Sequence, residues 1–139
     1  MSYQKIVIVG NLGRDPEMRY TESGQAVTNI NVATNRQYTA SSGEKVKETT
    51  WFRVSAWGRL AEICNQYLKT GRQVLVEGRL NPDRETGNPR VFERKDGTFG
   101  ASYEITADRV VFIGGRDDQG SYQVAEGDGE RIDEDEIPF

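Results

Sequence analysis

Two tryptophans and an arginine alternate along one stretch of the chain in a pattern that suits contact with flat, charged ligands. In TTWFRVSAW, residues 49–57, Trp51, Arg53 and Trp57 face one side of an extended strand. The intervening positions, which include Val54, are apolar and suit a core. The tryptophans are about 20 Å apart at roughly 3.3 Å per residue. Since every nucleobase has a π-face, they could stack on two bases of one strand.

A structural interpretation of the same tryptophans stays open. Both could pack in a core or in an interface between subunits, and their spacing alone favours neither interpretation. Tyr38, which lies close to Arg36 in the sequence, is a third candidate for stacking. A lone tyrosine at the end of a strand is more often an ordinary edge residue.

Basic residues accompany these aromatic residues and suggest a surface that meets phosphate groups. Neutralising phosphates would give sequence-independent affinity for nucleic acid, and this affinity would fall as salt rises. For any single lysine or arginine a solvated surface is the better interpretation, so the prediction depends on the combination with the aromatic residues. The basic candidates are Lys5, Arg36, Lys45, Lys47, Arg53, Arg59, Arg72, Arg79 and Arg84.

Catalytic chemistry finds little support in the sequence. The chain has no histidine, which argues against a zinc site and excludes a Ser–His or Cys–His nucleophile pair. GNLGRD, residues 10–15, lacks both the P-loop and the dinucleotide-binding glycine patterns. The single cysteine, Cys64, falls on the apolar side of a predicted helix and suits a core. We therefore expect a protein that is not an enzyme and that uses no metal or cofactor.

Hydrophobic periodicity predicts five strands and one helix. Residues 58–71 place apolar side chains at steps of three and four, as in a short amphipathic helix that Gly71 is placed to end. A polar hairpin loop, residues 39–48, is expected to hold Lys45 and Lys47 near its end, and a long hairpin is expected over residues 81–101. The predicted strands cover residues 5–12, 26–37, 49–57, 73–80 and 102–114, with a short extended piece at 17–22.

This order of elements predicts an all-β fold, a five-stranded OB-fold barrel with one short helix between strands three and four. OB folds commonly hold oligonucleotides on one face and in the adjoining loops. Another small antiparallel barrel with an inserted helix fits the pattern about equally well.

The charge of the chain divides at about residue 115. Residues 1–115 hold 16 Lys and Arg against 13 Asp and Glu, a net +3, whereas residues 116–139 hold two against nine, a net −7. The apolar pattern also stops there, and so polar a segment buries too little apolar area to offset the entropy of ordering. We predict a folded domain over residues 1–115 and a disordered acidic C-terminal tail over residues 116–139.

The last seven residues, DEDEIPF, suggest a protein-binding tip. Two apolar side chains could enter a pocket of a partner while the carboxylates meet its basic rim, and the proline lowers the ordering cost. A merely solubilising acidic tail is the alternative, and it gives the apolar end no purpose. The predicted partner-binding residues are Asp133, Glu134, Asp135, Glu136, Ile137, Pro138 and Phe139.

The sequence closely resembles the bacterial single-stranded DNA-binding proteins through VGNLGRDPEMRYTESGQAV, TTWFRVSAWGRLAEICNQYLKTGRQVLVEGRL and the closing DEDEIPF. The resemblance implies an OB fold, a homotetramer that wraps single-stranded DNA, and a tip that docks on replication, recombination and repair proteins. Trp51 and Trp57 stand where that family places stacking aromatics, and Tyr38 stands where it often has a tryptophan. The family's fourth stacking aromatic has no clear counterpart, and Phe92 or Phe99 is the nearest candidate.

The resemblance also implies a cytoplasmic, nucleoid-associated protein, and no apolar run approaches the roughly 20 residues that cross a bilayer. Two other classes remain open. An OB-fold relative in primosome assembly would be expected to lack the acidic tip. An RNA-binding module of the cold-shock type would stack RNA bases on the same aromatic residues.

Overall fold

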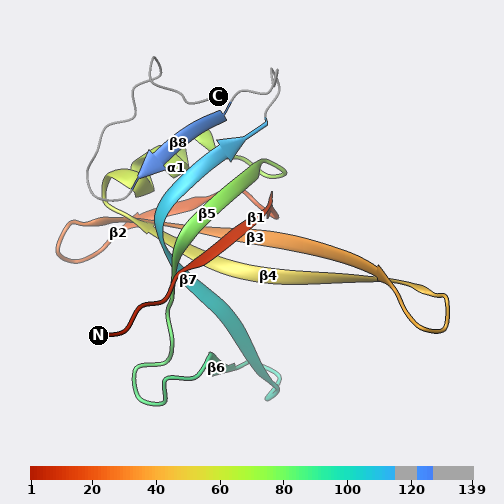
Figure 1. Ribbon diagram of the computed structural model, residues 1–139. Helices are drawn as coiled ribbons and strands as arrows, with labels where there is room; N and C mark the ends of the chain where they lie inside the picture. Colours follow the sequence, from red (N-terminus) through yellow and green to blue (C-terminus); the bar gives the residue numbers. More distant parts are fainter. Residues whose placement is uncertain (115–121, 127–139) are drawn as a thin grey trace.

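Five strands close a barrel in the computed structural model, which describes residues 1–114 and 122–126 (Figure 1). The barrel strands pair in the order β1–β5–β7–β4–β3, and β1 returns to β3 to close the ring. β4 and β7 run parallel, and the other barrel pairs are antiparallel. The elements are β1 (Ile6–Leu12), β2 (Glu17–Tyr20), β3 (Ala26–Thr39), β4 (Lys45–Trp57), α1 (Arg59–Tyr67), β5 (Gln73–Leu80), β6 (Arg90–Glu93), β7 (Phe99–Ile113) and β8 (Tyr122–Glu126).

This arrangement confirms the predicted five-stranded barrel with one helix between its third and fourth strands. Alternate residues of every barrel strand point inward, so Ile30, Val54 and Ile105 are almost completely buried. Burying each such side chain stabilises the fold by about 1.5–3 kcal/mol. Thr28, the only buried polar residue within residues 1–114, donates a 2.7 Å hydrogen bond to the carbonyl of Ala61 and so holds the helix against β3.

The helix is shorter than the sequence suggested. Its apolar side is buried as predicted, with Leu60 and Cys64 inaccessible to solvent, but α1 ends at Tyr67 because Leu68 is already extended. The N–H of Leu68 caps the helix by donating to the carbonyl of Cys64. Gly71 does not end the helix; its φ of +86° shapes the turn that leads into β5.

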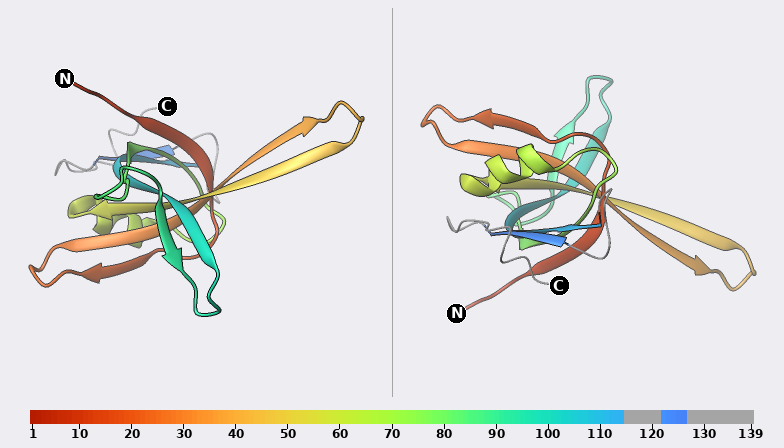
Figure 2. Two further views of the ribbon diagram at one scale, coloured as in Figure 1. Left: turned by 90° about the horizontal axis from the view of Figure 1, so that it is seen from below. Right: turned by 90° about the horizontal axis from the view of Figure 1, so that it is seen from above.

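Two hairpin arms extend from the barrel in different directions (Figure 2). In the first, β3 and β4 stay paired as far as Thr39 and Lys45, and the connecting loop is only residues 40–44. The prediction that Lys45 and Lys47 lie in a loop is therefore wrong, because both belong to β4. The second arm joins β6 to the first half of β7, where Arg90 pairs with Ser102. It confirms the hairpin expected over residues 81–101.

A further strand lies in the range where the sequence predicted a tail. β8 pairs antiparallel with the last part of β7, from Arg109 to Ile113. A strand that adds to an open edge is held by backbone hydrogen bonds, which residue patterns detect poorly. The tip, residues 133–139, lies outside the described residues, and the domain boundary at residue 115 stays a prediction. No helix in the described part of the chain has the length and apolar character that a membrane crossing needs.

Candidate nucleic-acid interface

One face of the β3–β4 ribbon carries the tryptophans together with a row of asparagines. The antiparallel register sets Asn31 opposite Arg53 and Ala33 opposite Trp51. Asn29 accepts a 3.0 Å hydrogen bond from the hydroxyl of its cross-strand neighbour Ser55. This face is therefore polar and aromatic, and its side chains bond to one another across the strands.

Burial confirms the predicted division of β4 into two faces. Val54 and Ala56 are fully buried, whereas 53% of Trp51 is exposed. Arg53 is exposed as well, and Trp57 is half-buried. The core interpretation therefore fails for Trp51, whose indole is available for contact with a ligand.

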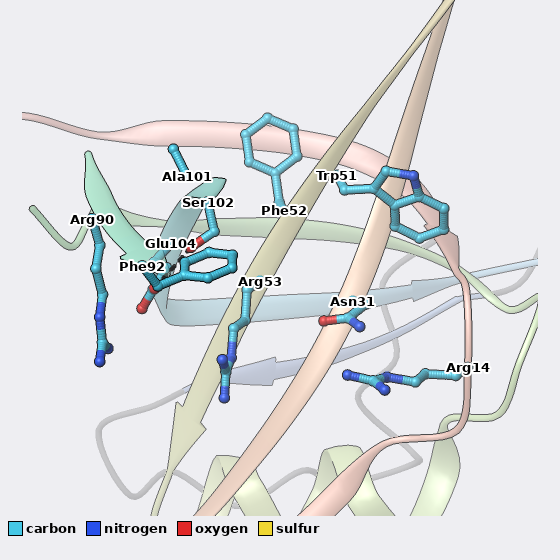
Figure 3. A pocket seen from close by; sticks show the side chains of 10 residues that line it. All are labelled: Arg14, Asn31, Trp51, Phe52, Arg53, Arg90, Phe92, Ala101, Ser102 and Glu104. Carbon is cyan, nitrogen blue, oxygen red and sulfur yellow. Dashed lines mark hydrogen bonds between the residues drawn. The ribbon is translucent and has the colours of Figure 1, made fainter. Parts of the chain in front are cut away.

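A pocket of about 470 Å³ opens between the two hairpin arms (Figure 3). Trp51 and Arg53 from β4 line one side of it, and Arg90 and Phe92 from β6 line the other. Arg14 lines it on the same side as Trp51. Its volume lies within the roughly 300–1,000 Å³ of sites that hold small organic ligands. The pocket brings exposed aromatic rings and guanidinium groups together from three separate parts of the chain.

Trp51 rests against a glycine in the segment between β1 and β2. A Cβ at Gly13 would lie 2.5 Å from both Cη2 and Cζ3 of the Trp51 indole, much closer than van der Waals contact allows. Because Gly13 has no side chain, the ring lies directly on its backbone. The φ of Gly13 is not among the positive values of this fold, so the ring and not the backbone conformation requires glycine here.

Phe92 is held by a comparable arrangement on the β6–β7 arm. A Cβ at Gly100, its cross-strand neighbour, would lie 2.9 Å from Cζ of Phe92 and 2.5 Å from an Nη atom of Arg94. The Arg94 guanidinium lies 5.6 Å from the Phe92 ring centre and donates a 2.7 Å hydrogen bond to the carbonyl of Phe99. Phe92 is 42% exposed and so retains a face for stacking.

The pocket is positively charged, with three arginines and one glutamate in its lining. Turned so that its oxygen faces Arg14, the Asn31 amide accepts two hydrogen bonds of 2.9 Å from that guanidinium. Asn31 then fixes the orientation of Arg14 without neutralising it. A fixed, uncompensated guanidinium beside exposed rings suits contact with phosphate and bases.

The structure does not bring Tyr38 to this pocket. Tyr38 pairs with Val46, and Arg36 with Glu48, so by alternation these residues lie on the face of the β3–β4 ribbon opposite to that of Trp51. The Arg36 guanidinium lies 4.8 Å from the Tyr38 ring centre and 3.6 Å from a carboxylate oxygen of Glu48. A role for Tyr38 in binding thus requires contact with the projecting arm itself.

The other basic candidates are dispersed. Arg79 forms a 3.6 Å ion pair with Asp108, and the guanidinium of Arg72 lies 5.9 Å from the ring centre of the core residue Phe112. Exposed residues outside the pocket account for the rest: Lys5 before β1, Lys45 and Lys47 on the first arm, Arg59 at the start of α1, and Arg84 in the segment before β6. Of the predicted basic residues, the pocket gathers only Arg53.

Cys64 behaves as a core residue. Complete burial raises the pKa of its thiol to about 12, which removes the thiolate that nucleophilic chemistry needs. Within residues 1–114 and 122–126, no cluster of three or more His, Cys, Asp or Glu side chains is placed to hold a metal ion.

Residues 3–113 match the single-strand binding protein family. The chain belongs to this family. It is 39% identical over 118 residues to the single-stranded DNA-binding protein of Neisseria meningitidis serogroup A, over 85% of this chain and 64% of that protein. It is 49% identical over 90 residues to single-stranded DNA-binding protein 1 of Chlorobaculum tepidum, over 62% of this chain and 56% of that protein. The chain spans about three-fifths of the length of these relatives.

Membership of the single-strand binding protein family confirms the resemblance noted in the sequence. Of the two candidates for a fourth stacking aromatic, Phe92 lines the pocket and Phe99 does not. Sequence reasoning missed five polar residues that also line it: Arg14, Asn31, Arg90, Ser102 and Glu104. Alternation along residues 26–37 puts Asn31 on the polar side of its strand, but only the strand register links that side to Trp51.

Proposed function

We propose that this chain binds single-stranded DNA without strong sequence preference and protects it during replication, recombination and repair. The observation that carries the proposal is the pocket between the arms, where the exposed rings of Trp51 and Phe92 stand beside three arginines. Rings can stack on any base, at about 1–3 kcal/mol per base, and guanidinium groups neutralise phosphates. The names of the family and of the relatives support single-stranded DNA as the ligand. Such binding needs no catalytic group.

Titration with poly(dT) across a salt series tests this proposal. Trp51 and Trp57 are the only tryptophans of the chain, so stacking should quench most of its indole fluorescence. Affinity should fall as salt rises, and a duplex of equal length should bind far more weakly. Trp51→Ala and Trp57→Ala should each weaken binding by about 1–3 kcal/mol and leave unfolding cooperative. A preference for duplex, or affinity that ignores salt, would contradict the proposal, and tighter binding of RNA would favour the cold-shock alternative.

We further propose that the functional unit is a homotetramer that wraps DNA over several subunits. One edge of β1 pairs with β5 from Ile6 to Asn11, but the other edge meets β3 only at Asn11 and Leu12. From Ile6 to Val9 that second edge pairs with no strand of the described chain, and an open edge is a template for another copy. Val7 and Val9 on this strand are about half exposed, which suits burial between subunits.

Sedimentation equilibrium tests the assembly. At micromolar concentration we expect one species near four times the chain mass of 15.6 kDa. Val7→Glu and Val9→Glu would place charges on the exposed side of β1 and should shift the equilibrium toward smaller species. A monomeric parent protein would contradict wrapping over several subunits.

The tip is proposed to recruit replication, recombination and repair proteins. In residues 133–139 four carboxylates precede Ile137, Pro138 and Phe139, a sequence that combines charge with an apolar anchor. A labelled peptide of this sequence should bind such partners, as measured by fluorescence anisotropy, and Phe139→Ala should abolish most of the affinity while it retains all four carboxylates. Equal affinity of the two peptides would leave a solubilising acidic segment. We propose that the protein acts in the cytoplasm, on the DNA of the nucleoid.

A further inference from the structure

The floor of the pocket carries a carboxylate, which is an unusual group at a site for a polyanion. Ser102 and Glu104 lie on the same face of β7, and the Ser102 hydroxyl donates a 2.9 Å hydrogen bond to Oε2 of Glu104. Arg53 is the register partner of Glu104 on β4, and Arg90 is the register partner of Ser102 on β6. Yet the three ion pairs of the described residues all join other side chains. Glu104 therefore presents acceptor capacity that no arginine of the described chain occupies.

The walls of the pocket would aim the edge of a base at this carboxylate. β4 flanks β7 on one side and supplies Trp51, while β6 flanks it on the other side and supplies Phe92. Figure 3 shows the two rings on opposite sides of the pocket, with Ser102 and Glu104 toward the β6 side. A base that stacks on Phe92 has its hydrogen-bonding edge in the plane of its ring. That edge can meet the floor of the pocket, where Glu104 lies.

Resting on the proposed function, we propose that Glu104 makes this subsite selective for guanine by accepting hydrogen bonds from its Watson–Crick edge. An ionised carboxylate only accepts hydrogen bonds, and it has two oxygens side by side. Guanine presents two adjacent donors, N1–H and the exocyclic N2 amino group, which match the two oxygens. Thymine presents one N–H between two carbonyl oxygens, which a carboxylate repels, and adenine and cytosine each present one amino group. Unstacked bases of single strands are commonly recognised through this edge.

The same carboxylate opposes the phosphates of every bound strand. Removing its charge should therefore strengthen binding to strands without guanine and weaken the preference for guanine. Glu104 is half-buried, so its contact with a base would be partly exposed to water. We therefore expect the preference for guanine to be at the lower end of the range for bidentate base contacts, about fivefold in affinity. A purely electrostatic role for Glu104 would strengthen binding to all strands equally.

The test uses three oligomers of equal length: all-thymine, thymine with regularly spaced guanines, and the same oligomer with hypoxanthine in place of guanine. Hypoxanthine lacks only the exocyclic amino group, and lithium buffer suppresses quadruplexes. The full-length protein is compared with Glu104→Gln and with Glu93→Gln. Glu93→Gln is the control, because it also removes one negative charge from this arm. Glu93 follows Phe92 directly on β6, so its side chain points to the opposite face of the strand, away from the pocket.

We expect the parent protein and Glu93→Gln to bind the guanine oligomer about fivefold more tightly than the hypoxanthine oligomer. Glu104→Gln should bind all-thymine more tightly than the parent does and should reduce this ratio to below twofold. The inference would be overturned if the parent protein bound the guanine and hypoxanthine oligomers equally well, or if Glu104→Gln kept the same preference for guanine as the parent. Binding of the all-thymine oligomer would still support the proposed function in either case. Loss of all-thymine binding by the parent protein would instead overturn the proposed function itself.

Discussion

Gly13→Ala tests whether the backbone beneath Trp51 positions this ring for stacking. The added Cβ would lie 2.5 Å from two indole carbons, whereas carbon atoms in contact are about 3.5–4.0 Å apart. The ring must therefore shift or tilt by about 1 Å or more. Alanine fits the backbone conformation of Gly13, so the fold should lose little stability.

The expected cost follows from the energy of stacking. A well-placed ring contributes about 1–3 kcal/mol per base. A displaced ring retains part of that contact, so we expect Gly13→Ala to weaken poly(dT) binding by about 1 kcal/mol, close to fivefold. In a Trp57→Phe background, Trp51 becomes the only tryptophan. Acrylamide should then quench its fluorescence more readily once Gly13 is replaced.

A double-mutant cycle decides whether the effect passes through the ring. If Gly13 acts by positioning Trp51, Gly13→Ala should cost nothing further in a Trp51→Ala protein. An equal loss of affinity in both backgrounds would show that Gly13 contacts DNA itself or supports the segment between β1 and β2. Unchanged affinity in the single variant would show that stacking tolerates the displaced ring, and the positioning role would be wrong.

Three further predictions concern charge, pH and reactivity. Arg90→Gln should lower the slope of log affinity against log salt by about one, whereas Arg79→Gln, which breaks an exposed ion pair outside the pocket, should change it less. The Thr70 N–H and hydroxyl both donate to Asp15 and lower the pKa of its carboxyl below 3.8. The carboxylate therefore stabilises the fold above pH 3.8, and this stabilisation is lost as pH falls through the lowered pKa. Asp15→Ala should reduce the Tm at pH 7, and the difference from the parent should vanish in thermal melts at strongly acidic pH. Cys64 should resist a thiol reagent at pH 8 and react only when guanidinium unfolds the protein, because burial raises its pKa to about 12.

The barrel could be predicted from the sequence because its strands have one buried face. Where Val54 and Ala56 alternate with exposed residues, periodicity reports both the strand and the direction of its side chains. The projecting arm of β3 and β4 has no such face, since its residues from Asn35 to Thr39 are all exposed. Backbone hydrogen bonds between β3 and β4 hold this arm together, and they need no apolar side chains. The polar sequence of the arm therefore resembles that of a loop, which is why the sequence placed Lys45 and Lys47 in a loop.

The pocket could be predicted only in part, because its residues meet through strand pairing over long separations in the sequence. Alternation on β7 alone puts Glu104 on the side opposite to buried Ile105, but not beside any particular ring. Its neighbours are set by a parallel register with β4, about 50 residues earlier in the chain, and by the separate pairing of β7 with β6. Parallel pairing follows from barrel closure, which no local pattern encodes. The sequence pattern of this site consists of aromatic and basic residues, which bind all bases and phosphates alike. The fold adds the carboxylate of Glu104, a hydrogen-bond acceptor that can distinguish one base from another.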